Sequence, residues 1–515
     1  MKSWLRNPAV ILALVVVWRV LLLVFTVQPI PGNDAFGYDG PVVNFLHGGG
    51  YRNPSMALVF PISGTEIYSM YPPLYQGMLL VWMEWFGTSV VSAMALHVAL
   101  FAVCGWLTLA VIKLFFPAGA GYALPMLLLL NVTFDDRPEG LAFVFGLSAL
   151  WLVMGQLSEP KFSPGTAAML CLALLLGLYT SVIVGAYFFG VGFLACAAAF
   201  AWRRNLHWFA PFVAAAALFA LITFFIVRLE PRWWAGFLES ARQQSVVTAG
   251  FHRPRGDGLF KLVRTVPVFV LALAALPWVA AQRRRIFSAE SPWLALCAGI
   301  LVMGWVLLAL SVTLLPPSYT TFVTYTQILL AAGLLALARK YFPDRARLLR
   351  GLVAVCVLLV SIRAAGMTTW GAVCAWKNSY QDTQAVLRQE LQPFTASSQP
   401  VVISSAFLYT AVAMGVKNPV HSDWYFDHAH WSEGARADAL ERLRPPRLVL
   451  TQFDYYRDFT SPDAPVLEEL AQHPDQVEIQ IRNLAAVRPP DAIPWLQRLI
   501  QHVSWGPVIV DLNWK

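Results

Sequence analysis

Long apolar runs recur through the first two-thirds of this 515-residue chain. Each run approaches or exceeds the roughly 20 residues that a helix needs to cross about 30 Å of hydrocarbon. Hydrophobic residues make up 58% of the chain and charged residues only 13%. A soluble protein of this size would expose too much apolar surface with such a balance. The sequence therefore excludes a soluble enzyme and predicts a membrane protein with many helical spans.

We predict eleven spans from these runs. The run from 166 to 201 would be about 54 Å long as one helix, so we expect it to break between Gly177 and Gly185 into a hairpin of two short spans. Residues 72–87 are short and amphipathic, which favours a helix in the membrane interface over a twelfth span. The predicted spans are 8–27, 89–112, 118–134, 139–157, 166–180, 182–201, 206–227, 260–281, 292–315, 319–338 and 349–369.

The charges in the loops predict an orientation. With the N-terminus in the cytoplasm, the cytoplasmic segments collect fourteen Lys and Arg against three acidic residues, which is the positive-inside bias. The odd number of spans then places everything after residue 369 outside. We therefore expect a multi-pass protein of the inner (plasma) membrane with a cytoplasmic N-terminus and an extracytoplasmic, periplasmic C-terminal domain.

The segment 370–515 differs in composition from the rest, with 12 Lys and Arg against 16 Asp and Glu. Alternating apolar residues predict strands and periodic ones predict helices. The predicted fold is a membrane all-α domain of about eleven transmembrane helices (1–369) followed by an extracytoplasmic α/β domain (370–515). The strands are expected at 401–407, 447–453, 477–483 and 507–512, and the helices at 433–443, 463–472 and 491–503.

The first outer loop, 28–71, is longer than a connection requires, and its aromatic residues argue against disorder. It contains Asp34 and Asp39, each flanked by glycine and aromatic residues. Asp34 fits two interpretations, a catalytic base or the N-cap of a short interfacial helix that begins at Ala35. The HGGG string at 47–50 resembles part of an oxyanion hole, but the sequence has no GxSxG motif, which favours a turn.

A second acidic cluster lies between two predicted spans, in the string NVTFDDRPEGLAF at 131–143. Four charges at a lipid boundary are costly: Asp135, Asp136, Arg137 and Glu139. Asp136 suits an N-cap and the proline after Arg137 suits a first helical turn, so part of the cluster has a structural explanation. The remaining charges belong either to a solvated turn or to a functional site.

The outer loop 228–264 carries seven Lys and Arg against three acidic residues, which opposes the positive-inside rule. Arg242, His252, Arg253 and Arg255 lie in it. Guanidinium groups bind phosphate oxygens in pairs, so the loop suits a phosphate-bearing lipid beside the acidic sites. Anchoring to anionic headgroups is the alternative for any one residue.

The string HSDWYFDHAH at 421–430 contains residue types that bind metals, but in no recognised spacing. A surface loop is the favoured interpretation, and no metal site is predicted. Arg19 and Arg363 lie within spans, where each either reaches toward the interface or meets a buried partner.

The two acidic sites, the YPPL string at 71–74 and the outer C-terminal domain together resemble the GT-C class of polytopic glycosyltransferases. That class includes protein O-mannosyltransferases and lipid A aminoarabinose transferases. Its first-loop Asp is matched by Asp34, its second acidic motif by Asp135 or Asp136, and its Pro-Pro-Leu stretch by residues 72–74. The resemblance covers residues 1–210 well and the later spans only by number.

The resemblance implies transfer of a sugar from a polyprenyl-phosphate donor to an acceptor outside the cytoplasm, usually with inversion. Asp34 is then expected to take the acceptor proton, and Asp135 or Asp136 to orient the acceptor or hold an arginine. Residues expected to bind substrate are Asp39, Tyr71, Arg137, Glu139, Arg242, His252, Arg253 and Arg255.

The expected partners are the polyprenyl-phosphate sugar, a glycan, lipid or protein acceptor, and membrane lipids, with no nucleic acid. No cofactor is predicted beyond the lipid-linked donor as co-substrate, and the family leaves a divalent metal open. The alternatives are a polymerase or ligase of lipid-linked glycans and a transporter of a lipid-linked sugar. The position of the acidic residues at the outer boundary weighs against transport.

Overall fold

The structure is a computed structural model, which describes residues 7–27, 34–115, 137–158, 163–251, 271, 291–313, 326, 329–331, 343–426, 436–459, 466–472, 475–486 and 506–515. The chain divides into two compact units. The first comprises Met1–Val17, Ala99–Ile226 and Phe251–Ala364, and the second comprises Trp18–Val98, Val227–Gly250 and Ala365–Lys515. The C-terminal segment, expected from residue 370, thus shares its unit with the first outer loop.

The helical elements extend through both units. They are α1 (Pro8–Thr26), α2 (Ala35–Leu46), η2 (Pro54–Met56), α3 (Pro61–Thr65), α4 (Leu74–Phe86), α5 (Val90–Phe115), α7 (Glu139–Ser158), α8 (Pro164–Thr180), α9 (Val182–Arg203), η3 (Leu206–Phe209), α10 (Ala210–Leu229), α11 (Pro231–Phe251), α15 (Ser291–Thr313), α17 (Pro343–Lys377), α18 (Tyr380–Leu391), η5 (Gln392–Thr395), α19 (Ser405–Ala413), α21 (Arg436–Leu443), α22 (Gln452–Asp454), η6 (Tyr455–Phe459) and α23 (Val466–Ala471).

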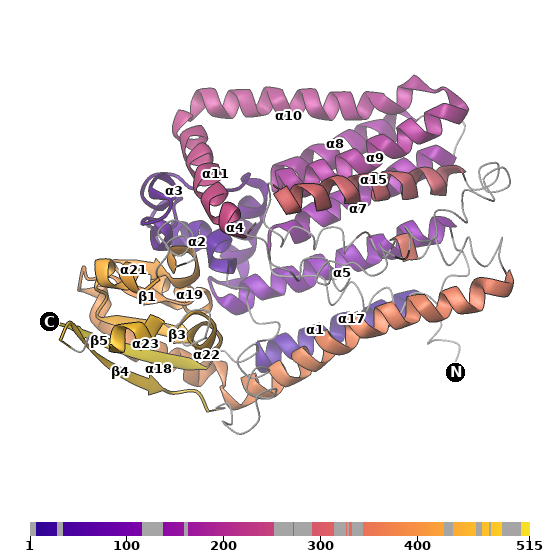
Figure 1. Ribbon diagram of the computed structural model, residues 1–515. Coiled ribbons are helices and arrows are strands. Elements are labelled where there is room, and N and C mark those ends of the chain that lie inside the picture. The colour runs from indigo at the N-terminus through magenta and orange to yellow at the C-terminus, as the bar shows by residue number, and fades with distance from the viewer. Residues whose placement is uncertain are drawn as a thin grey trace. The chain divides into compact units, whose positions relative to one another are not determined.

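Helices α7, α8, α9 and α15 pack against one another in the first unit (Figure 1). Small residues allow this packing. A Cβ added at Gly299 of α15 would meet the carbonyl oxygen of Val191 in α9, and one added at Gly185 of α9 would meet the backbone of Leu178 in α8. Close backbone approach at glycine is typical of helices packed within a membrane, where dispersion replaces the hydrophobic effect.

Five described helical segments are long and apolar enough to cross a membrane: Pro8–Thr26, Val90–Leu114, Glu139–Leu157, Val182–Phe200 and Leu206–Leu229. Two shorter apolar helices cover Pro164–Thr180 and Pro292–Leu307. The protein is therefore a multi-pass membrane protein. The predicted hairpin is confirmed, because Ser181 adopts an extended conformation and separates α8 from α9.

The count of eleven spans stays a prediction. Helices cover the predicted spans that start at 8, 89, 139, 166, 182, 206, 292 and 349. The predicted spans 118–134 and 260–281, and most of 319–338, lie outside the described residues.

The helix expected at 72–87 is α4, which begins at Leu74 and ends where Gly87 adopts a φ of +86°. Its buried residues Tyr75, Leu79 and Met83 recur every four positions and form one face, while Val81, Trp85 and Phe86 are exposed. One buried stripe and one exposed apolar edge are typical of a helix at a membrane interface.

The C-terminal segment forms a five-stranded mixed sheet in the order β2-β1-β3-β5-β4. β1 pairs in parallel with β2 and β3, whereas β5 pairs antiparallel with β3 and β4. The strands are β1 (Val401–Ile403), β2 (Pro419–His421), β3 (Arg447–Thr451), β4 (Val477–Asn483) and β5 (Pro507–Trp514).

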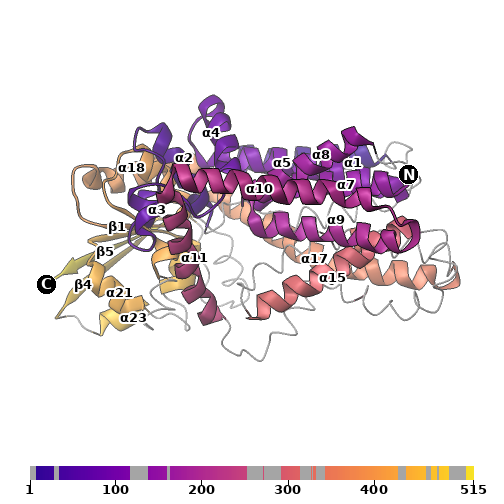
Figure 2. The same cartoon turned by 90° about the horizontal axis from the view of Figure 1, so that it is seen from above.

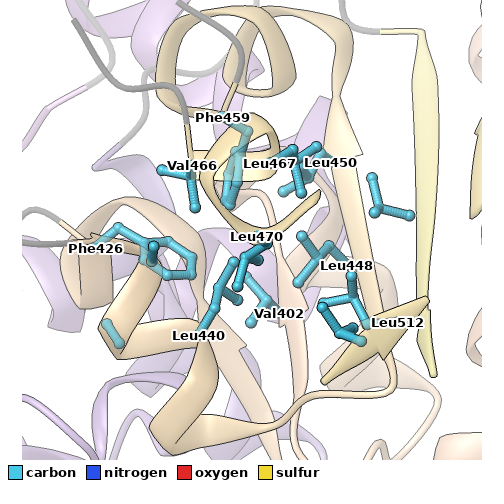
Figure 3. Packing of buried hydrophobic residues seen from close by; sticks show 14 of the residues in the cluster. Val402, Phe426, Leu440, Leu448, Leu450, Phe459, Val466, Leu467, Leu470 and Leu512 are labelled. Atoms are coloured by element: carbon cyan, nitrogen blue, oxygen red, sulfur yellow. The ribbon is translucent and has the colours of Figure 1, made fainter. Parts of the chain in front are cut away.

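One face of this sheet carries the hydrophobic core shown in Figure 3, where Leu440, Leu467 and Leu470 of α21 and α23 pack on Val402 and Leu448 of the strands. Neighbouring strand residues point to the opposite face. Helix α18 contacts β5, and α19 contacts β2 and β3. The sheet is therefore covered by helices on both faces, as expected for an α/β domain.

The predicted strands at 447–453, 477–483 and 507–512 and the predicted helices at 433–443 and 463–472 are confirmed within a few residues. The predicted strand 401–407 is wrong after Ile403, because residues 405–413 form α19. The predicted helix 491–503 lies outside the described residues.

Candidate functional site

Helix α2 carries both acidic residues of the first loop and is buried from Ala35 to Asn44. Its sequence contains Gly37, Gly40 and Pro41, all of which disfavour a helix interior. Tertiary packing must therefore stabilise this helix. A Cβ at Gly37 would press on the indole of Trp424, and a Cβ at Gly40 would overlap the side chain of Asn53.

Asn53 compensates for the proline in α2. Pro41 has no N–H to donate to the carbonyl of Gly37. The side-chain Nδ2 of Asn53 lies 2.9 Å from the carbonyl oxygen of Phe36 and 3.4 Å from that of Gly37. Asn53 is fully buried, so this amide supplies a donor where the helix lacks one.

Asp34 lies directly before α2 and is half-buried. The helix begins at Ala35 as expected, but the Asp34 side chain makes no cap hydrogen bond, so the capping interpretation is wrong. A different residue accepts from the first turn, since the N–H of Phe36 donates to Oγ of Ser405 at 3.0 Å. The side chain seen to accept from this turn is therefore that of Ser405.

Asp39 is completely buried, with 0% of its surface exposed. Its Oδ1 accepts a hydrogen bond from the hydroxyl of Tyr75 at 2.9 Å, and its Oδ2 accepts one from the hydroxyl of Tyr409 at 2.6 Å. The hydroxyl oxygen of Tyr75 is also 3.1 Å from Nε2 of His97. In this conformation Asp39 links α2 to α4 and α19; substrate contact stays a prediction.

Tyr71 is buried and lies edge-on to Tyr38 of α2, with ring centroids 4.9 Å apart. Tyr38 in turn lies edge-on to Trp424, whose ring also contacts Phe60. The aromatic residues of the first loop therefore form a packed cluster with the C-terminal segment. A substrate role for Tyr71 stays a prediction.

Arg137 and Glu139 stand at the start of α7, in the first unit. Nε of Arg137 lies 3.5 Å from Oε2 of Glu139, whose side chain is buried. Pro138 occupies the turn before the helix, whose first residue is Glu139. The ion pair keeps the charges together at the helix end. Asp135 and Asp136 lie outside the described residues.

Helix α11 carries two basic residues of the later outer loop, Arg232 and Arg242. Oε2 of Glu239 accepts from the N–H of Ile62 at 3.0 Å, which attaches α11 to α3, and both views show these helices side by side (Figures 1 and 2). Arg242 is exposed on α11. His252, Arg253 and Arg255 lie outside the described residues.

A cavity of about 180 Å³ opens between α2 and α4. Its lining carries no charged side chain and consists of Val42, Phe45, Tyr51, Pro73, Gln76, Gly77 and Leu80. Burial raises the pKa of the Tyr51 phenol, which keeps this group neutral at ordinary pH. An uncharged lining suits an apolar group better than a phosphate.

The structure corrects the prediction of a surface loop at 421–430. His421 ends strand β2, and the side chains of His421, Ser422 and Asp423 are buried. Residues 427–430 lie outside the described residues. Within the described part of the chain, no group of three His, Cys, Asp or Glu side chains has the arrangement to hold a metal ion.

The HGGG string forms a turn, as expected. Gly48 and Gly50 adopt φ angles of +80° and +81°, which glycine reaches without strain. The side chain of Asn44 donates to the carbonyl of Gly50 at 2.9 Å. This turn ends α2 and starts the segment that carries Asn53.

The second unit thus brings Asp34, Asp39 and Tyr71 into one packed region. The sequence did not predict the residues that hold them there: Asn53, Tyr75, His97, Ser405 and Tyr409. Of these five residues, only Tyr75 has a local signal in the sequence, because it directly follows the YPPL string.

The sequence matches no protein-family model and no curated protein sequence. The structure is similar to that of ArnT from Cupriavidus metallidurans bound to undecaprenyl phosphate, with a TM-score of 0.51 and 14% sequence identity over 97% of both chains. The apo state of that protein gives a TM-score of 0.49 at 14% identity over 97% of both chains.

The oligosaccharyltransferase AglB from Archaeoglobus fulgidus, in complex with an inhibitory peptide and a dolichol-phosphate, gives a TM-score of 0.46 at 13% identity over 88% of this chain and 70% of that chain. ArnT is a GT-C glycosyltransferase. The likeness to ArnT therefore confirms, at the level of the fold, the resemblance inferred from the sequence motifs.

Proposed function

We propose that this protein is a membrane glycosyltransferase that moves a sugar from a polyprenyl-phosphate donor to an acceptor at the extracytoplasmic face, with inversion. One observation carries the proposal. Asp34, the acid matched by the sequence motif, is half-buried and directly precedes the buried helix α2, in a chain with a GT-C fold. A neighbour with that fold, ArnT, was crystallised with undecaprenyl phosphate, which supports a lipid-phosphate donor.

The proposed role of Asp34 is general base. The acceptor hydroxyl or amine attacks the anomeric carbon of the sugar, and its proton passes to the Asp34 carboxylate as the new bond forms. The bond from that carbon to the phosphate oxygen breaks on the opposite side, so polyprenyl phosphate leaves and the anomeric configuration inverts. Such proton transfer contributes about 10²–10⁴ to the rate.

The leaving phosphate gains negative charge, which fixed guanidinium groups stabilise. We propose this role for Arg137 and for the basic residues of the later loop, Arg242, Arg253 and Arg255, and we propose that His252 also binds substrate. Asp135 or Asp136 orients the acceptor or holds an arginine. The pairing of Arg137 with Glu139 supports an arginine whose orientation is already fixed before substrate binds.

We further propose that the N-terminus is cytoplasmic and that residues 370–515 are extracytoplasmic. The positive-inside bias supports this orientation. The packing of α19 on α2 supports placing residues 370–515 on the same side as the first loop, because two segments in contact lie on the same side of a membrane. Ten of the eleven predicted spans lie between α2 and α19 in the sequence. An even number of crossings returns the chain to the side it left, in agreement with the predicted count.

The test uses the purified full-length protein in lipid nanodiscs, with short-chain polyprenyl-phosphate sugars as donors and hydroxyl and amine acceptors. We expect transfer of one sugar and release of polyprenyl phosphate, and a loss of about 10²–10⁴ in kcat for Asp34→Asn. Asp475→Asn, at an exposed turn before β4, is the matched control with unchanged kcat.

Other outcomes decide between the alternatives. Transfer of a whole oligosaccharide would identify a polymerase or ligase, and movement of intact donor across a vesicle membrane would identify a transporter. Normal turnover of Asp34→Asn would remove Asp34 as the base.

A further inference from the structure

Helices α2 and α19 are attached to each other at two points, although they come from opposite ends of the chain. Ser405 begins α19, and its Oγ accepts the N–H of Phe36. One turn later the hydroxyl of Tyr409 donates to Oδ2 of Asp39. Residues four apart share a face of a helix, as do residues three apart, so Ser405 and Tyr409 match Phe36 and Asp39 across the interface.

Aromatic packing strengthens this attachment. The ring of Tyr409 lies edge-on to the ring of Phe36, with 4.9 Å between centroids and an interplanar angle of 77°. All four side chains at the two points are buried. A hydrogen bond shielded from water is costly to break, because breaking it leaves a buried donor or acceptor without a partner. Such bonds therefore fix the geometry of the groups they join.

The same carboxylate continues the network into the membrane helices. Tyr75 donates its hydroxyl hydrogen to Asp39, so the Nε2 of His97, 3.1 Å away, must donate to the Tyr75 oxygen. Helix α2 is thus held at Asp39 by α19 and by α4, and Tyr75 of α4 in turn contacts His97 of α5. Asp34 directly precedes this helix, five residues before Asp39.

We propose that Ser405 and Tyr409 are positioning residues through which the C-terminal domain holds α2, and with it the Asp34 carboxylate, in the place required for sugar transfer. The proposal rests on the proposed function. Ser405 accepts the N–H of Phe36 in the first turn of α2, two residues after Asp34. Displacement of a catalytic group by about 1 Å reduces a rate by about 10²-fold.

The experiment compares Ser405→Ala, Tyr409→Phe and the double variant in the full-length protein. We expect kcat to fall about 10- to 100-fold with KM for the donor nearly unchanged, and Ser405→Thr, which keeps the hydroxyl, to restore most of the activity. Tyr425→Phe is the matched control, because the hydroxyl of Tyr425 donates to the carbonyl of Ala439 within the C-terminal domain. Its kcat should equal that of the unsubstituted protein.

Hydrogen exchange of the peptide 34–46 provides a readout independent of activity. We expect faster exchange in Ser405→Ala and Tyr409→Phe and no change in Tyr425→Phe. Wild-type kcat in both variants would overturn the positioning role. Faster exchange in a protein that transfers no sugar from any donor would instead refute the proposed function and leave the attachment of α2 intact. Unchanged exchange would refute the attachment itself.

Discussion

Glu390 and Arg482 form a bidentate ion pair in the C-terminal segment, with Nη1 2.7 Å from Oε1 and Nη2 2.8 Å from Oε2. Arg447 donates to Glu390 and Asp511, and Arg482 also donates to Asp511. The network joins α18 to strands β3, β4 and β5. Bidentate hydrogen bonds between charged groups are among the strongest hydrogen bonds in proteins.

This network predicts that acid destabilises the C-terminal segment. The hydrogen bond from Arg482 holds the pKa of the Glu390 carboxyl below its ordinary 4.5. Because the folded-state pKa is the lower one, the stabilisation is fully present above about 4.5 and is lost as the pH falls through the folded-state pKa. Hydrogen exchange of β4 and β5 at pH 7 and pH 4 measures the loss.

The matched variants are Glu390→Gln and Glu478→Gln, the second at an exposed position on β4. We expect Glu390→Gln to reduce the effect of acid on hydrogen exchange and Glu478→Gln to leave that effect unchanged. Identical pH dependence in Glu390→Gln and the unsubstituted protein would contradict the assignment.

Asn53→Ala is expected to destabilise the protein by about 1–3 kcal/mol, because it leaves the carbonyl of Phe36 buried without its side-chain donor. Thermal unfolding of the full-length protein in detergent measures this effect. Asn418→Ala is the control, since its amide donates to a carbonyl at 3.3 Å in an exposed position. Equal melting temperatures for the two variants would argue against the special role of Asn53 beside Pro41.

Gly40→Ala and Gly77→Ala should change the melting temperature in opposite directions. The added methyl group at Gly40 would overlap the Asn53 side chain, whereas nothing lies within 4 Å of the one added at Gly77. Alanine is the better helix former by about 1 kcal/mol, so Gly77→Ala on α4 should raise the melting temperature and Gly40→Ala should lower it. A raised melting temperature for Gly40→Ala would mean that α2 does not pack as described.

Cysteine labelling in intact cells or sealed vesicles tests the orientation. Asp475→Cys in the C-terminal segment and Ser163→Cys before α8 both place a thiol at an exposed position. We expect a membrane-impermeant maleimide to label the first from outside and the second only after permeabilisation. The unsubstituted protein measures labelling of the native cysteines. The reverse pattern would overturn the proposed topology.

Strong local patterns made part of the fold predictable. The strand at 477–483 alternates apolar and polar residues, and the strand predicted at 507–512 contains the β-branched run Val508–Val510. The break at Ser181 follows from the length that one membrane-spanning helix can have. The end of the strand predicted at 401–407 is helical because a short, fully buried apolar run has no periodicity that separates a helix from a strand.

Only those residues of the site that stand out from their immediate sequence neighbours could be predicted. Asp34 and Asp39 stood out as carboxylates in a loop rich in glycine and aromatic residues. Ser405 and Tyr409 gave no such signal, because their roles depend on partners 369 and 370 residues away. For the same reason, burial of Asp39 between two tyrosines was not apparent from its spacing to Asp34.

The separation of 369 residues between Phe36 and Ser405 has a consequence for biosynthesis. Every predicted membrane span is encoded before Ser405, and α2 is synthesised 369 residues before its partner in α19. Under the proposed positioning role, a chain truncated just before residue 405 would carry α2 without its partner helix and would transfer sugar poorly.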